Sequence, residues 1–285
     1  MKILQNESLR KYTTFKIGGP ALTLVVPESY PDLINFLRDH PLDPATVILG
    51  EGSNVLISDN GINSTVLKIS FGQIEFIPDS NMVKVGAGVK LSNLAKTLSA
   101  KALTGLEFVF GIPGTVGGAI VMNAGLKDQW ISQALTRVFC VDFSGKEIVI
   151  NQAAAGFGYR RSRFQTEKLI ITAAEFALEK DNSGKIKKRM ENFKIKRSET
   201  QPLALPSAGS IFKNPAQGPA AMLIEACGLK GAKIGGAAVS EQHANFIINQ
   251  KEATAQDVLQ LIDLIQRKVF DKFQVKLELE IRVII

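Results

Sequence analysis

The chain is poor in cysteine, tryptophan, tyrosine and histidine. Its 285 residues include two cysteines, one tryptophan, three tyrosines and two histidines. Cys140 and Cys227 stand alone, without a CxxC spacing or a histidine at metal-ligand spacing, which argues against a disulfide scaffold and a metal site. We therefore expect buried thiols, no metal and a cytoplasmic location. The length accommodates two or three domains.

Targeting and membrane segments are also missing from the sequence. The first residues contain no seven-residue apolar run and no small-residue cleavage site, so we expect no signal peptide. Between Glu107 and Lys127 lie 19 uncharged residues, but five are glycine and one is proline. These residues weaken a helix by about 1 kcal/mol per glycine and ~3 kcal/mol for proline. We therefore expect no membrane insertion.

Positive charge exceeds negative charge by 7, and basic residues gather at 184–197. Such a run is typical of a solvated helix face, although it can also attract an anionic small molecule or a nucleic acid. The basic stretches carry no interleaved aromatic residues on which bases could stack. We expect no nucleic-acid partner and a monomeric protein.

Hydrophobic periodicity predicts a chain of the α+β class. Helical spacing marks residues 30–39, with Ser29 as N-cap, and residues 91–102, 219–227 and 258–269. Strand patterns occur in "TVIL", "VLIS", "STVLKIS", "NMVKVGAGV", "EKLIITAAEFAL", "HANFIIN", the hairpin "RVFCVDFSGKEIVI" and the alternating C-terminal "VKLELEIRVII". A basic linker or helix is expected up to about residue 200.

Two glycine-rich stretches raise the question of a ligand. "GEGSNV", residues 50–55, has Val55 in place of the third glycine of a dinucleotide fingerprint and precedes a strand, which argues against a Rossmann site. Gly50 and Gly52 can adopt positive φ in a tight turn that presents Ser53 and Asn54. "GIPGTVGGAIVMNAG", residues 111–125, is either a close-packed turn and helix or a backbone that offers N–H groups to an anion.

Three polar motifs are candidates for chemistry. "GYRRSRF", residues 158–164, sets arginines beside Tyr159 and Phe164, as expected where a guanidinium is held against a carboxylate or phosphate. "SAGSIFKNP", residues 207–215, contains Ser210, either a turn residue or a hydroxyl aimed into a cleft. Glu280 and Arg282 share one face of the last predicted strand, either exposed or able to act on one ligand group.

These motifs occur together and in order, and the chain resembles the UDP-N-acetylenolpyruvoylglucosamine reductase family over residues 10–285. The resemblance implies a flavoprotein oxidoreductase that makes UDP-N-acetylmuramate for bacterial peptidoglycan, the polymer required for cell shape and cell division. It implies the FAD-binding α+β fold of the vanillyl-alcohol oxidase (PCMH) type and the family's shorter form. The implied division is residues 1–70 with 272–285 and residues 71–195 for FAD, and residues 196–271 for a separate α+β substrate-binding subdomain.

Functional residues are carried over by motif. The implied catalytic residues are Arg160, Ser210 and Glu280. The implied substrate-binding residues are Tyr159, Lys213, Asn214 and Arg282. The implied FAD-binding residues are Gly50, Gly52, Ser53, Asn54, Gly111, Gly114, Thr115, Gly117, Gly118 and Ala119. The chain departs from the family at Leu126 and Lys127, and after Arg282, where "VII" stands in place of a pattern with glycine.

The family's chemistry gives these residues roles. NADPH reduces FAD, and N5 of the reduced flavin then gives hydride to C3 of the enolpyruvyl group of the UDP-sugar. Arg160 and Glu280, the latter protonated if desolvated, stabilise the negative charge on the adjacent carboxylate, and Ser210 protonates C2. Residues 111–118 are expected to hold the FAD phosphates with backbone N–H groups, without a lysine.

Two other hypotheses remain open from the sequence. A flavin oxidase of the same fold would react rapidly with oxygen and produce peroxide. A basic nucleotide-binding module would bind a UDP-sugar without any redox change.

Overall fold

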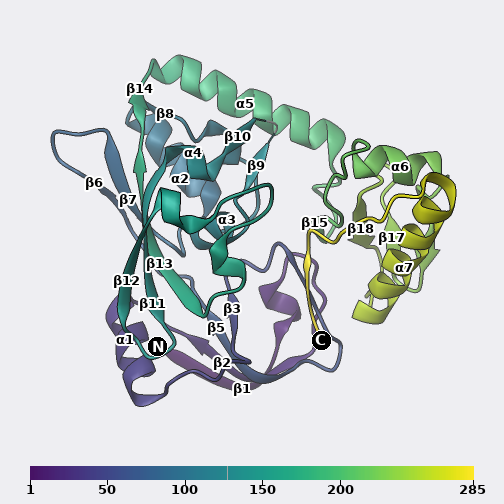
Figure 1. Ribbon diagram of the computed structural model, residues 1–285, viewed down its shortest axis with the longest axis horizontal. Helices are drawn as coiled ribbons and strands as arrows, with labels where there is room; N and C mark the ends of the chain where they lie inside the picture. Colours follow the sequence, from purple (N-terminus) through teal and green to yellow (C-terminus); the bar gives the residue numbers. More distant parts are fainter. Residues whose placement is uncertain (127) are drawn as a thin grey trace. The chain divides into compact units, whose positions relative to one another are not determined.

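The computed structural model describes residues 1–126 and 128–285, which form two compact units. Unit 1 comprises Met1–Leu4, Thr23–Glu51 and Ser64–Lys196, and unit 2 comprises Gln5–Leu22, Gly52–Asn63 and Arg197–Ile285. Figure 1 labels the elements along the chain. Four elements contain residues of both units: β1 (Lys2–Ser8), β2 (Pro20–Val26), β5 (Ile62–Lys68) and α5 (Ser183–Thr200). One sheet has the strand order β1-β2-β5-β3.

The other elements of unit 1 surround an antiparallel sheet of order β12-β11-β13-β7-β6 (Figure 1). Helix α3 packs on β13 and β7 of this sheet. The 3₁₀ helices are labelled η. The bounds are α1 (Tyr30–Asp39), β3 (Val47–Leu49), β6 (Ile74–Phe76), β7 (Met82–Gly86), α2 (Leu91–Ala100), β8 (Leu103–Thr104), η2 (Glu107–Val109), α3 (Val116–Val121), β9 (Gly125–Leu126), β10 (Gln129–Trp130), α4 (Ile131–Ala134), β11 (Leu135–Asp142), β12 (Glu147–Asn151), η3 (Gln152–Ala155), η4 (Arg163–Gln165), β13 (Leu169–Ala177) and β14 (Glu179–Lys180).

Unit 2 is built on a second antiparallel sheet of order β15-β18-β17-β16, against which α7 packs (Figure 1). Strand β19 pairs in parallel with β4 in the same unit. The bounds are η1 (Leu9–Tyr12), β4 (Val55–Ile57), β15 (Ser207–Ser210), α6 (Ala220–Ala226), β16 (Lys233–Ile234), β17 (Ala237–Val239), β18 (Phe246–Asn249), α7 (Ala255–Phe273) and β19 (Arg282–Ile284).

Local signals explain where the helices begin and end. The Ser29 hydroxyl accepts the Asp32 N–H at 3.2 Å, so α1 begins as its N-cap predicts. Helix α6 ends before Gly228, whose φ is +70°. Helix α2 ends earlier than predicted, because Ala102 lies at φ +55°, outside helical geometry. The basic stretch is a helix, α5, and it buries Ile186 and Met190.

Two predictions made from the sequence are wrong. The C-terminal residues alternate in burial from Val275 to Ile281, but the strand covers only Arg282–Ile284. The extended chain changes partner there, from a bridge between Leu279 and Phe212 to the ladder with β4. The second wrong prediction is that both thiols are buried, because Cys227 is only half-buried. Cys140 is buried, and its burial raises the pKa of its thiol to about 12.

Candidate functional site

The first glycine loop, Gly50–Asn54, turns its carbonyls to the protein and leaves its amides open. The Gly50, Gly52 and Asn54 carbonyls accept hydrogen bonds from Lys68 Nζ at 2.6 Å, Thr14 N at 3.1 Å and Arg282 N at 3.0 Å, respectively. Within residues 1–126 and 128–285, the N–H groups from Gly50 to Asn54 donate to no protein acceptor. A run of open amides is the arrangement that binds an anion.

Glycine is required at one point of this loop. Gly52 has a φ of +66°, and a Cβ there would lie 2.2 Å from the Tyr12 carbonyl oxygen in unit 2. A larger residue would force the backbone away from Tyr12, so the loop path depends on this glycine.

The second glycine loop combines the two alternatives that the sequence left open. Val116 N donates to Val89 O and Gly117 N to Ala87 O, both at 2.9 Å, so this part is a close-packed turn and helix. The N–H groups of Gly114 and Thr115 find no acceptor in the described part of the chain. Gly117 therefore contributes the absence of a side chain against Ala87, while the open amides lie before the helix.

The two loops meet within unit 1. A Cβ built on Gly50 would lie 2.7 Å from Thr115 Oγ1, and this hydroxyl also accepts the Gly118 N–H at 3.4 Å. Lys90, which bridges to Thr115 through the backbone, pairs with Glu51 at 3.2 Å. Side-chain-free backbone with open amides at Gly50 and Glu51 and at Gly114 and Thr115, all in unit 1, fits the diphosphate of FAD.

Two lysines lie close to these loops. Lys68 bonds to Gly50, and Lys90 pairs with Glu51. Lys68 is the last residue of β5, which runs parallel to β3 with Lys68 opposite Leu49. The sequence shows both strands but not their pairing, so it could not place this lysine behind the loop.

Arg160 stands at the tip of a tight turn in unit 1. Gly158 and Arg161 exchange backbone hydrogen bonds at 3.0 and 3.2 Å, and Arg160 lies at φ +51°. The Asn123 side chain, at the exit of the second glycine loop, donates to Gly158 O at 3.0 Å. Asn123 thereby fixes the turn that carries Arg160, and it was not among the predicted site residues.

The Arg160 guanidinium lies beside two aromatic rings. Its Cζ lies 5.7 Å from the ring centres of both Tyr159 and Trp130, and Nη1 donates to Gly125 O at 3.1 Å. Trp130 is far from Arg160 in the sequence and no motif pointed to it. The rings and the carbonyl fix the orientation of a group that can bind a carboxylate.

Ser210 and Glu280 lie together in unit 2. Glu280 N donates to Ile211 O at 2.8 Å, and Lys213 N donates to Glu278 O at 2.9 Å, so residues 278–280 run along residues 211–213. Asn54 Nδ2 donates to Glu280 O at 3.1 Å. The structure thus pairs the segment that follows Ser210 with the segment that carries Glu280. Arg160 belongs to the other unit.

A buried asparagine supports the segment that follows Ser210. Asn245 accepts Phe212 N at 2.9 Å through Oδ1 and donates to Phe212 O at 2.8 Å through Nδ2. It also accepts Ile211 N at its backbone oxygen, at 2.9 Å. Asn245 was not among the predicted site residues, although the predicted strand "HANFIIN" contains it.

The predicted substrate-binding residues of unit 2 are placed as follows. Asn214 accepts the Ala220 N–H at 3.0 Å, at the start of α6. Lys213 Nζ lies 3.4 Å from the Glu278 carboxylate. Arg282 is exposed and is fixed through its backbone to Asn54. Of the two departures from the family pattern in the second loop, Leu126 lies in β9, and Lys127 lies outside the described residues.

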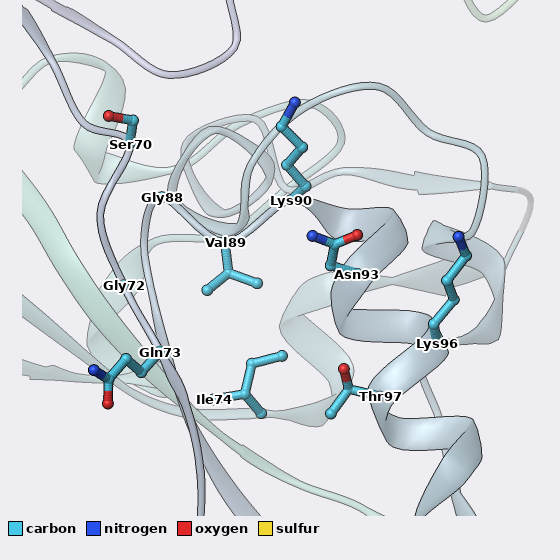
Figure 2. Close-up of a pocket in the computed structure, with 10 residues that line it drawn as sticks. All are labelled: Ser70, Gly72, Gln73, Ile74, Gly88, Val89, Lys90, Asn93, Lys96 and Thr97. Atoms are coloured by element: carbon cyan, nitrogen blue, oxygen red, sulfur yellow. The ribbon is translucent and has the colours of Figure 1, made fainter.

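Figure 2 shows a separate hollow of about 570 Å³ in unit 1. Val89 and Ile74 line it from one side, and Asn93 and Thr97 of α2 line it from another (Figure 2). None of the predicted site residues lines this hollow. In the described residues, no group of three His, Cys, Asp or Glu could hold a metal ion.

Two protein families match different parts of the chain. Residues 21–151 match the family described as "FAD binding domain". Residues 201–284 match the family described as "UDP-N-acetylenolpyruvoylglucosamine reductase, C-terminal domain".

Relatives cover nearly the whole chain. The UDP-N-acetylenolpyruvoylglucosamine reductase of Bacillus pumilus is 41% identical over 99% of this chain and 94% of its own length. That of Caldanaerobacter subterraneus is 43% identical, with the same coverage. The crystal structure of the Thermus caldophilus UDP-N-acetylenolpyruvylglucosamine reductase is 33% identical, covers 100% of this chain and 98% of its own, and superposes with a TM-score of 0.83.

Proposed function

Because the chain belongs to the UDP-N-acetylenolpyruvoylglucosamine reductase family, we propose that it uses NADPH to reduce the enolpyruvyl ether of a UDP-sugar to the lactyl ether of UDP-N-acetylmuramate. It is an FAD-dependent oxidoreductase that acts on UDP-N-acetylenolpyruvylglucosamine. We place it in the cytoplasmic synthesis of peptidoglycan precursors, as a monomer. The observation that carries the proposed chemistry is the pairing of the Ser210 and Glu280 segments.

The two glycine loops are proposed to hold FAD. The open amides of Gly50–Asn54, Gly114 and Thr115 would bind its diphosphate, and Gly111, Gly117, Gly118 and Ala119 would keep bulky groups away. When bound, FAD supplies the hydride that the substrate accepts. The residues of the chain then have to bind the sugar nucleotide, neutralise charge and move one proton.

Ser210 is proposed as the proton donor to C2 of the substrate. Hydride addition at C3 leaves electron density at C2 and on the adjacent carboxylate, and transfer of the Ser210 hydroxyl proton to C2 completes the reduction. The Asn245 bonds to Phe212 and Ile211 fix the strand that carries this hydroxyl. A positioned acid of this kind contributes ~10²–10⁴-fold to the rate.

Arg160 and Glu280 are proposed to bind the substrate carboxylate as its charge grows. The aromatic rings around Arg160 fix its guanidinium, so it needs little reorganisation during the reaction. Tyr159, Lys213, Asn214 and Arg282 are proposed to bind the substrate. The cationic side chains among them suit the diphosphate of a UDP-sugar.

Separate half-reactions of Ser210→Ala test this function. Reduction of the bound flavin by NADPH is expected to remain at the wild-type rate, because it needs no proton donor to carbon. Reoxidation by the enolpyruvyl UDP-sugar is expected to fall by ~10²–10⁴-fold. Both rates are measured by stopped-flow absorbance of the flavin.

Ser207→Ala, on the same strand β15, is the matched control and should leave both half-reactions intact. Equal loss of both rates in Ser210→Ala would remove Ser210 from the acid role. A purified protein that is colourless and takes up no added FAD would refute the flavoenzyme assignment for this chain.

A further inference from the structure

The Gly50 carbonyl is held differently from the other inward carbonyls of the first glycine loop. Backbone amides of Thr14 and Arg282 hold Gly52 O and Asn54 O, whereas a lysine ammonium, Lys68 Nζ, holds Gly50 O at 2.6 Å. The parallel register of β3 and β5 sets Lys68 opposite Leu49, the residue before Gly50. The chain therefore places a full positive charge where a neutral donor would satisfy the same carbonyl.

The charged groups near this ammonium act on the pKa of Lys68 in opposite directions. Burial lowers the pKa of Lys68, and the Lys90 ammonium lowers it too, while Glu51 opposes both. Glu51 is itself paired with Lys90 at 3.2 Å. Lys68, Lys90 and Glu51 thus form a group of charges at the base of the open amides.

We propose that Lys68 is a positioning residue for the diphosphate of the flavin cofactor, acting through the Gly50 carbonyl. By fixing that carbonyl, its ammonium keeps the following amides pointed outward, and its charge adds to the field that attracts the phosphates. This inference rests on the proposed binding of FAD by the two glycine loops. It adds a side-chain charge to a site whose sequence suggests backbone contacts alone.

The test measures FAD binding to the apoprotein, not turnover. FAD is stripped from the full-length holoprotein and titrated back, and the quenching of flavin fluorescence gives the Kd. Lys68→Met is expected to raise the Kd by about 10- to 100-fold, the range expected for a charged hydrogen bond. Lys68→Arg keeps the charge and is expected to stay within about 3-fold of the wild type.

Lys96→Met is the matched control. Lys96 is an exposed lysine on α2 at the edge of the hollow in Figure 2, so its loss removes the same charge from unit 1 without touching Gly50. It is expected to change the Kd by less than about 2-fold, because solvent and salt screen exposed charges. Circular dichroism and thermal unfolding of each apoprotein check that it is folded.

The pH profile separates a charge effect from a purely structural one. If FAD binding favours protonated Lys68, the affinity is complete below the lowered pKa of Lys68 and falls as the pH rises through it. The ratio of the wild-type Kd to the Lys68→Arg Kd should therefore rise with pH, and this ratio cancels any ionisation of FAD itself. Lys90 pairs with Glu51 beside this site, so Lys90→Gln is a further control and should retain the profile.

Distinct outcomes overturn the inference and the proposed function. A wild-type apoprotein that binds no FAD contradicts the proposed function. A wild type that binds FAD while a folded Lys68→Met binds it with the same Kd overturns the role of Lys68 alone.

Discussion

Arg160 shows how a single residue is prepared for its task. Its φ of +51° is rare for a residue with a side chain and costs on the order of 1–3 kcal/mol. The surrounding contacts offset this cost: Gln165 donates to Arg160 O at 3.0 Å, and Asn123 holds the adjacent Gly158. The strained turn directs the guanidinium to Trp130 and Tyr159.

Asn245 supports the segment that follows Ser210, as the contacts around Arg160 support its turn. Measuring the stability of a variant tests this support. Asn245→Ala leaves the buried Phe212 amide and carbonyl without partners, each of which costs about 1–3 kcal/mol. We therefore expect the free energy of unfolding to fall by about 2–4 kcal/mol in urea titrations. Gln256→Ala, at an exposed position of α7, is the control, and a loss for Asn245→Ala below about 0.5 kcal/mol would contradict this reading.

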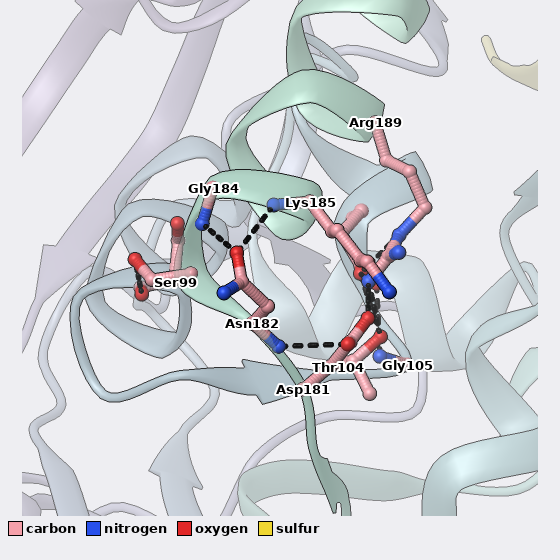
Figure 3. Close-up of polar contacts among 10 residues, drawn as sticks. Ser99, Thr104, Gly105, Asp181, Asn182, Gly184, Lys185 and Arg189 are labelled. Carbon is pink, nitrogen blue, oxygen red and sulfur yellow. Dashed lines mark hydrogen bonds and ion pairs between the residues drawn. The ribbon is translucent and has the colours of Figure 1, made fainter.

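At the scale of elements, a polar network joins α5 to the segment before the second glycine loop. Glu107 accepts the Thr104 hydroxyl at 2.6 Å, Gly105 N at 2.8 Å and Arg189 Nε at 2.9 Å. Figure 3 shows Arg189 reaching from α5 to this cluster, where it also binds Asp181, and Asn182 accepting amides of Gly184 and Lys185 at the start of the helix.

The Glu107 network predicts a pH-dependent stability. Burial alone would raise the pKa of Glu107, but the bonds from Thr104, Gly105 and Arg189 outweigh it, so the pKa lies below its usual 4.5. The stabilisation is therefore complete above that value and is lost as the pH falls through the lowered pKa. Glu107→Gln should cost about 1.5–3 kcal/mol at pH 7.

Urea unfolding of the wild type and Glu107→Gln at several pH values measures this effect. The difference between the two proteins should shrink as the medium becomes acid. A difference that is independent of pH would mean that the Glu107 charge does not contribute. Asp181, whose pKa Arg189 also lowers, is unchanged in both proteins and so drops out of the comparison.

At the scale of the whole molecule, each unit has its own sheet and core. Buried residues of β11, β13 and α2 belong to the core of unit 1, and those of β18 and α7 belong to that of unit 2. No helix in the described residues is long and apolar enough to cross a membrane. The family and the structural similarity both extend over nearly the entire chain.

Cofactor binding should stabilise the whole protein. A ligand at 100 times its Kd that binds only the folded state adds about 2.7 kcal/mol, so FAD should raise the Tm of the apoprotein by about 5 °C. Differential scanning fluorimetry measures the shift. FMN, which lacks the adenylate and the diphosphate, is the control, and an equal shift with FMN would contradict binding through the glycine loops.

Much of the fold could be predicted from local patterns. The helix at 30–39, the hairpin of β11 and β12, and the stop at Gly228 are where the sequence puts them, since caps, periodicity and glycine act over a few residues. The C-terminal strand was overestimated because alternation reports which side chains are buried, not which segment supplies the hydrogen-bonding partner.

For the candidate site, the sequence by itself determined the chemical groups: two glycine loops, an arginine beside a tyrosine, a serine after a glycine, and a terminal glutamate. Only the tertiary structure decided which distant residues support these groups. Lys68 reaches Gly50 because β5 runs parallel to β3, and the segments that carry Ser210 and Glu280 lie together because residues 278–280 pair with 211–213. Such pairings depend on the packing of segments distant in the chain, and no short stretch of sequence encodes them.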